Sequence, residues 1–215
     1  MSDHPRLMHH FEDLGQQKEA SALGMWLFIA QEIMFFGGLF LTYAVYRTLN
    51  PHAFAEASAH LDWKLGAINT VVLIGSSLTM AMAVHSAALG KGKAIAGWLV
   101  LTIALGGVFL SVKVVEYSEK FHHHLVPGPH FHFEGPQAHA AEIFFSLYFA
   151  MTGLHALHMI VGIPILATMA WMGWRGRFSP EYHTPVELTG LYWHFVDIIW
   201  IFLFPLLYLL GAHQV

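Results

Sequence analysis

The sequence contains no cysteine and little charge. Without cysteine, the chain cannot form disulfides, thiolate metal sites, iron–sulfur clusters or covalent c-type haem attachments. Only 11% of its 215 residues are charged, whereas soluble domains carry about 25%. The net charge is −4 and no basic tract is present, which argues against nucleic acid as a partner. Because 56% of the residues are hydrophobic, the composition predicts one helical membrane domain.

The sequence also lacks the short motifs of many enzyme classes. It has no nucleophile motif, phosphate-binding loop or dinucleotide fingerprint. Residues 1–21 are polar and mixed in charge, without the basic, apolar and small-residue order of a cleavable signal. We therefore expect these residues to form a cytoplasmic N-terminal segment. The first apolar run is then expected to act as both targeting signal and first span.

Five apolar runs are long enough to cross a membrane, because a hydrocarbon core of about 30 Å requires roughly twenty helical residues. The predicted fold class is an all-α integral membrane bundle of five transmembrane helices, within a domain over residues 22–212. The expected spans are residues 22–46, 66–89, 94–117, 141–174 and 185–211. Before the last span, residues 184–187 read as a capping box with Thr184 at the N-cap and Pro185 at the first helical position.

Lysine and arginine in the connecting segments predict the orientation. Six basic residues fall on the side of the N-terminus: Arg6, Lys18, Lys91, Lys93, Arg175 and Arg177. Fewer fall on the other side, so the N-terminus is expected in the cytoplasm and the C-terminus outside. The loop over residues 118–140 is then external. Its many histidines could bind copper or zinc, but carboxylates flank it only at its edges, so we favour a solvated loop or a subunit contact.

Glu32 lies inside the first apolar run, about 15 Å from the start of that helix. A carboxyl group at this depth is costly in hydrocarbon, so its side chain is expected to face protein. It could be a proton-relay or lipid-contact residue, or a structural residue bonded to a neighbouring helix. We favour the structural role.

A second set of ionisable residues lies at the outer end of the third span. Lys113, Glu116 and Lys120 follow one face of a helix, so Glu116 can pair with either lysine. This pattern predicts a structural clamp. His194 and Asp197, in the fifth span, are three apart and share a face that should meet protein or trapped water.

Histidines within the spans raise the question of haem. His155 and His158 share a face of the fourth span, but His158 lies about 20 Å from its inner end, far from the expected depth of His194. His85 and His194 are expected at matching depth and are the one feasible axial pair. Hydrogen bonds between helices are the interpretation we favour for these histidines.

Four blocks of sequence carry a family resemblance. They are residues 24–36 around Glu32, the pair Glu116-Tyr117, residues 152–158, and the segment from His183 to Trp200. Together they resemble subunit III of the haem–copper oxidases, the cytochrome c and quinol oxidases of respiratory chains. The resemblance extends over residues 23–209, and Glu32 falls on the family's buried glutamate.

The resemblance implies a non-redox accessory subunit, itself non-catalytic, in a bacterial plasma membrane. Haem and copper would belong to subunits I and II, and this chain would bind none. It would pack beside subunit I, with subunit II and a small subunit IV as further partners, bind phospholipid, and support proton uptake and sustained activity. The residues with structural or proton-linked roles would be Glu32, Glu116, His155, His158, His194 and Asp197.

The chain departs from the long form of the family, which has seven spans. It resembles the bacterial five-span forms and lacks the two helices that make one wall of a V-shaped lipid cleft, so another subunit or an extension of subunit I would supply that wall. Alternative functions are subunit III of a quinol oxidase, an accessory subunit of nitric oxide reductase, and a membrane cytochrome b with His85 and His194 as haem ligands. The sequence leaves the electron donor, the lipid and the stoichiometry of the complex open.

Overall fold

The computed structural model describes residues 8, 11–133 and 137–209. Parts of the expected N-terminal segment and His-rich loop, and the expected end of the fifth span, lie outside the described residues. In the described part the regular elements are α-helices: α1 (Leu14–Leu49), α2 (Pro51–Ala59), α3 (Trp63–Ala88), α4 (Gly92–His122), α5 (Ala138–Trp174) and α6 (Thr184–Tyr208). All but α2 are long and apolar enough to cross a membrane. The predicted all-α, five-span bundle is confirmed.

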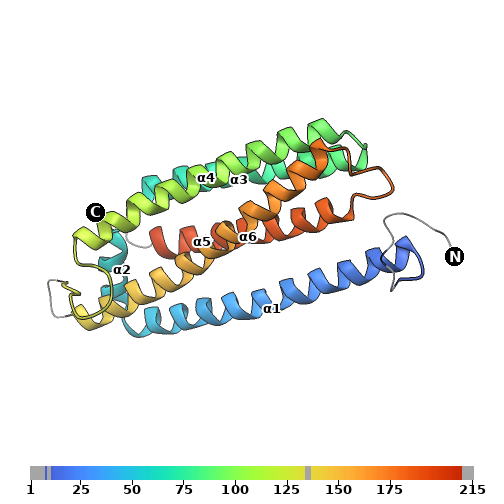
Figure 1. The fold of residues 1–215 in the computed structure, drawn as a ribbon. Coiled ribbons are helices and arrows are strands. Elements are labelled where there is room, and N and C mark those ends of the chain that lie inside the picture. Colours follow the sequence, from blue (N-terminus) through green and yellow to red (C-terminus); the bar gives the residue numbers. More distant parts are fainter. Residues whose placement is uncertain (1–7, 9–10, 134–136, 210–215) are drawn as a thin grey trace.

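The five long helices lie side by side and alternate in direction (Figure 1). We call one end of the bundle the amino end; it holds the start of α1 and the links at residues 89–91 and 175–183. The opposite end, here the loop end, holds α2 and the segment between α4 and α5. Because the number of spans is odd, α1 begins at the amino end of the bundle and α6 finishes at the loop end.

Several helices extend beyond the expected spans. Helix α1 begins at Leu14, where the Asp13 carboxylate accepts a hydrogen bond from the backbone N–H of Gln16 at 2.8 Å. Helices α4 and α5 both continue into the segment expected as a loop, ending at His122 and beginning at Ala138. At these ends the helices continue through polar residues beyond the apolar runs. The ends of the helices therefore do not mark the membrane surfaces, and the bounds of the membrane spans stay a prediction.

The sequence analysis did not anticipate α2, a short helix at the loop end. Pro51 occupies its first turn, a position that needs no backbone N–H. Its Phe54 and Ser58 side chains are buried, and Ser58 Oγ donates a hydrogen bond to the Leu207 carbonyl at 2.6 Å. Helix α2 thus satisfies a carbonyl in the last turn of α6, where a helix does not supply partners for its own carbonyls.

Helix α6 lies at the centre of the packing. Its Trp193 and Trp200 are fully buried, and Trp193 Nε1 donates to Ser76 Oγ on α3 at 2.8 Å. Gly106 on α4 and Gly162 on α5 make room for the Trp193 ring, because a Cβ atom at either position would lie about 3 Å from it. Small residues at these sites allow three helices to approach one indole.

The start of α6 differs from the expected capping box. The helix begins at Thr184, and His183 is the N-cap residue, without a side-chain cap bond. The Glu187 carboxylate instead contacts His183 Nε2 at 3.2 Å and Lys18 Nζ at 3.3 Å. The prediction of Thr184 as the capping residue is therefore wrong. Glu187, the acidic residue of the expected capping box, pairs instead with side chains from outside the first turn.

Candidate functional site

Lys113 and Glu116 form a buried ion pair at the loop end of α4. Lys113 Nζ lies 2.9 Å from Glu116 Oε2, and the two side chains are 3% and 1% exposed. Tyr148 on α5 and Tyr208 on α6 each donate a hydroxyl hydrogen bond to Glu116 Oε1, at 2.8 and 2.6 Å. Both hydroxyls also accept from Lys113 Nζ, at 3.1 and 2.9 Å. The three N–H donors of the ammonium group are therefore all used, and three helices meet at one pair.

Aromatic rings surround the Lys113 ammonium group on its remaining sides. It lies 5.0 to 5.6 Å from the ring centroids of Tyr117, Tyr148, Trp200 and Tyr208. Rings at such distances attract a cation electrostatically, most strongly where water is excluded. The predicted pairing of Lys113 with Glu116 is present, but the aromatic cage was not predicted.

Lys120 occupies a different setting two turns further along α4. Its side chain is 3% exposed, and its Nζ lies 3.9 Å from Glu119 Oε2. Of the two lysines predicted as possible partners of Glu116, Lys113 is the one that pairs with it. Lys120 borders a pocket of about 610 Å³ together with Glu56, His60, Glu119, His123 and His132. Part of the His-rich loop thus lines a polar pocket at the loop end. Among the described residues, no group of three or more histidines and carboxylates is arranged to hold a metal ion.

Glu32 on α1 meets His158 on α5. The Glu32 Oε2 atom lies 3.3 Å from His158 Nε2, and the glutamate side chain is buried. His158 Nδ1 lies 2.8 Å from the Leu154 carbonyl, which can only accept, so Nδ1 carries a proton. Glu32 Oε2 has no partner with hydrogen-bond geometry among the described residues. The contact is therefore a close approach of two ionisable side chains that joins α1 and α5.

The other histidine of the fourth span has a different environment. Both ring nitrogens of His155 are buried without a hydrogen-bond partner among the described residues. The ring packs against Phe109, at 5.2 Å between centroids, and against Trp200, at 5.3 Å. His155 therefore fills space between α4, α5 and α6 as an aromatic ring, and the expected hydrogen bond between helices is not formed by this residue.

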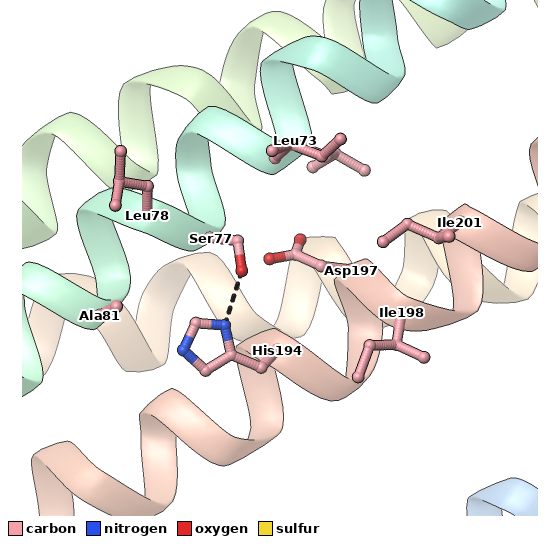
Figure 2. A pocket seen from close by; sticks show the side chains of 9 residues that line it. Leu73, Ser77, Leu78, Ala81, His194, Asp197, Ile198 and Ile201 are labelled. Carbon is pink, nitrogen blue, oxygen red and sulfur yellow. Dashed lines mark hydrogen bonds between the residues drawn. The ribbon is translucent and has the colours of Figure 1, made fainter.

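His194 and Asp197 border a pocket between α3 and α6 (Figure 2). Ser77 Oγ on α3 lies 2.8 Å from His194 Nδ1, a hydrogen bond that joins the two helices. The Asp197 side chain is 3% exposed, and it points to the same pocket. Neither of its oxygens has a hydrogen-bond partner in the described part of the chain. The expected shared face is present, and Ser77 is the neighbour that the sequence analysis missed.

The expected match in depth between His85 and His194 is wrong. Gly190 packs directly on Val84, because a Cβ atom at Gly190 would lie only 2.8 Å from Val84 Cγ2. His194 lies one turn of α6 further on and bonds to Ser77, about 12 Å before His85 along α3. Two axial ligands must approach one iron from opposite sides at one level. The geometry of α3 and α6 does not place these two histidines in that way.

Further polar bonds between helices come from residues that the sequence analysis did not select. Tyr43 OH on α1 donates to the Leu206 carbonyl at 2.8 Å, and Tyr192 OH on α6 donates to the His158 carbonyl at 2.9 Å. Trp200 Nε1 on α6 donates to Thr70 Oγ1 on α3 at 3.1 Å. Their only signal in the sequence is a polar tip on an aromatic ring inside an apolar run.

These contacts share one chemical character. Most of them join a polar side chain of one helix to a side chain or a backbone carbonyl of another, whereas His155 and Asp197 have no hydrogen-bond partner in the described part of the chain. Polar contacts of this kind hold neighbouring helices in register. The fold and its polar contacts define a class: a multi-pass membrane protein whose interior is organised for cohesion between helices.

The particular family follows from comparison with known proteins. The family model of cytochrome c oxidase subunit III matches residues 15–212, so the chain belongs to this family. It is 32% identical to cytochrome c oxidase subunit 3 of Synechocystis over 87% of this chain and 74% of the relative. It is 33% identical to cytochrome bo(3) ubiquinol oxidase subunit 3 of Pseudomonas putida over 93% and 89%. Quinol oxidase subunit 3 of Bacillus subtilis is 30% identical over 88% and 86%.

Proposed function

We propose that this chain is the non-redox accessory subunit III of a respiratory cytochrome c oxidase, with haem and copper held by partner subunits. The observation that carries the proposal is the family match over residues 15–212, which includes all five candidate spans. Relatives with both cytochrome c oxidase and ubiquinol oxidase names match at similar identity. The second candidate is therefore subunit III of a quinol oxidase, which differs in the electron donor and not in the role of this chain.

The role proposed for this chain is to stabilise subunit I and to support proton uptake during oxygen reduction and proton pumping. Glu116 supports it as the centre of a contact among α4, α5 and α6. Glu32 and His158 support it as a contact of two ionisable side chains between α1 and α5. The remaining interior residues are His155, a packed aromatic ring, and His194, which bonds α6 to α3. Asp197 is the buried acid beside His194.

A phospholipid is proposed for the groove between α1 and α6. This groove has a volume of about 450 Å³ and an almost entirely apolar lining. Trp26, Ile33 and Phe40 of α1 face Phe195 and Phe202 of α6 across it. Aliphatic and aromatic walls of this kind suit an acyl chain, which adds no hydrogen bonds of its own.

The proposed location is a bacterial plasma membrane, with the amino end of the bundle in the cytoplasm. Its partners there are subunit I, subunit II and a small subunit IV. Lys91, Lys93 and Arg175 all lie at the amino end, and the positive-inside rule places such clusters in the cytoplasm. The last helix then finishes on the external side.

The test is to purify the chain in mild detergent and to identify the co-purifying subunits by mass spectrometry. We expect oxidase subunits I and II, with haem absorbance that follows subunit I. Glu32→Ala is expected to weaken assembly or shorten sustained turnover without changing haem content per subunit I. Glu19→Ala, at an exposed site on the same helix, is the control. A haem spectrum retained by the isolated chain, or the absence of oxidase subunits, would contradict the proposal.

A further inference from the structure

Asp197 is a buried acid whose hydrogen-bonding capacity is not met within the described chain. Its side chain is 3% exposed, and both carboxyl oxygens lack a partner there. Ser77 borders the same pocket and contacts His194 Nδ1, but its hydroxyl has a single proton and so can donate to at most one of the two Asp197 oxygens. At least one oxygen of Asp197 therefore lacks a donor, and burial of such a group is costly.

The depth of Asp197 limits what can supply the donor. It lies about 20 Å along α6 from Thr184 and about 17 Å from Tyr208, which places it near the middle of the span. Lipid headgroups and bulk water lie outside a hydrocarbon core of about 30 Å. A donor at this depth is either a water trapped in the pocket or a group of another molecule that itself enters the core.

The groove that leads to Asp197 has the length of a membrane-crossing helix. The pocket around Asp197 has a volume of about 430 Å³, and a second pocket of about 430 Å³ shares Ala81 and His194 with it. Together they follow α6 from Thr184 to Ile201, about 25 Å of helix. A hydrocarbon core requires a helix of similar length.

The walls of the groove suit a packed helix better than a flexible chain. Ser77 and Ala81 are small residues one turn apart on α3, which allows close approach of another backbone. Leu78 on α3 and Ile201 on α6 also line the groove and are 64% and 47% exposed. Side chains of this size can pack between those of a facing helix.

We propose that the groove between α3 and α6 receives a transmembrane helix of a neighbouring oxidase subunit, which donates a hydrogen bond to Asp197 from a hydroxyl, amide or indole side chain. The inference rests on the proposed function, because it requires partner subunits in the membrane. It adds the place of contact on this chain and the chemistry of the contacting side chain.

Photo-crosslinking in the intact complex tests this contact. The chain has no cysteine, so single cysteines at Leu78→Cys and Ile201→Cys can carry a benzophenone maleimide in native membranes. Irradiation is expected to give adducts with a transmembrane segment of another oxidase subunit, mapped by mass spectrometry. Val100→Cys, exposed on α4 outside the groove, is the matched control and is expected to give mainly lipid adducts.

Substitutions at Asp197 test the hydrogen bond itself. Asp197→Asn keeps an acceptor oxygen and is expected to preserve the adduct from Leu78→Cys. Asp197→Leu removes the acceptor and is expected to lower that adduct about tenfold, the effect of one hydrogen bond on an association constant. Thr79→Val, which removes the 2.8 Å bond from α3 to Thr102 on α4, should leave it unchanged. The helical content of each variant, measured by circular dichroism, separates loss of contact from loss of fold.

The outcomes distinguish this inference from the proposed function. Oxidase subunits that co-purify and crosslink from the groove support both. Oxidase subunits that co-purify while the groove positions give only lipid adducts overturn the inference and leave the proposed function standing. If no oxidase subunit co-purifies, the proposed function fails, and the inference fails with it.

Discussion

Lys113 Nζ lies 2.9 Å from Glu116 Oε2 in the interior of the bundle, and each group is saturated by the same two tyrosine hydroxyls. Lys113→Met leaves Glu116 as an unpaired buried charge, so we expect a loss of about 3–5 kcal/mol of stability. The double variant Lys113→Met/Glu116→Gln removes both charges and is expected to regain more than half of that loss. Thermal unfolding of the purified complex measures both.

Lys93→Met is the control for this comparison, because Lys93 is exposed on the same helix. It is expected to change stability by less than about 0.5 kcal/mol. A double variant that is less stable than Lys113→Met would show that the pair is not what stabilises this part of α4.

The contact between Glu32 and His158 predicts coupling across α1 and α5. Glu32→Gln and His158→Gln each remove one side of the 3.3 Å contact, so the two losses should not add. A double-mutant cycle on the thermal stability of the complex is expected to give a coupling energy of about 0.5–3 kcal/mol. Glu19→Gln, also on α1 but exposed, should show no coupling with His158→Gln. Additive losses in the first cycle would contradict a direct contact.

Gly162 predicts a packing defect of defined size. A Cβ atom there would lie 3.0 Å from the Trp193 ring and 3.1 Å from Tyr192. Gly162→Ala is therefore expected to cost about 1–3 kcal/mol through overpacking. Gly97→Ala, where nothing lies within 4 Å of the new atom, should be neutral or stabilising by about 1 kcal/mol, because alanine favours helix. Equal effects of the two substitutions would mean that Trp193 moves aside freely.

The bond from Tyr43 to the Leu206 carbonyl predicts a smaller effect at the loop end. Tyr43→Phe leaves that carbonyl without its side-chain donor, at a cost of about 0.5–1.5 kcal/mol. Tyr46→Phe, one turn further along α1 and exposed, should change thermal stability by less than about 0.5 kcal/mol. If Tyr43→Phe cost no more stability than Tyr46→Phe, the hydrogen bond from Tyr43 to the Leu206 carbonyl would be contradicted.

The proposed orientation predicts opposite accessibility of the two ends. Single cysteines at Lys91→Cys and His122→Cys lie in exposed positions at the amino end and the loop end. In whole cells, a membrane-impermeant maleimide is expected to label only His122→Cys, since that end is proposed to be external. In inside-out vesicles, Lys91→Cys should be labelled instead. The reverse pattern would invert the proposed topology.

The number and order of the membrane helices could be predicted from the sequence, because span length and hydropathy depend on local composition alone. Glu116 was correctly expected to pair within α4, since its partner Lys113 lies one turn away. Tyr148 and Tyr208, which complete that contact, are far apart in sequence. Their convergence depends on the rotation of α5 and α6 about their axes, which no local pattern encodes.

Other features were missed for related reasons. Helix α2 is too short to show a clear period, although Pro51 gave a start signal. The packing of Gly190 on Val84 sets the level of His194 along α3. The depth of His194 relative to His85, when counted from the helix ends, was therefore wrong by one to two turns. Ser77 and Tyr192 carry no distinctive sequence signal, and only the assembled bundle identifies their partners.

Helix α1 contacts the rest of the bundle mainly through α6 and α5, and three polar contacts fix it at successive levels. Lys18 meets Glu187 near its start, Glu32 meets His158 midway, and Tyr43 reaches Leu206 beyond. Between these levels α1 and α6 face each other across the apolar groove. Loss of one of these contacts would leave the other two in place, together with the packing of Ile29 and Phe36. The wall that α1 gives to the groove is thus anchored at three separate depths, and an acyl chain inside it would pack against a surface held at each of them.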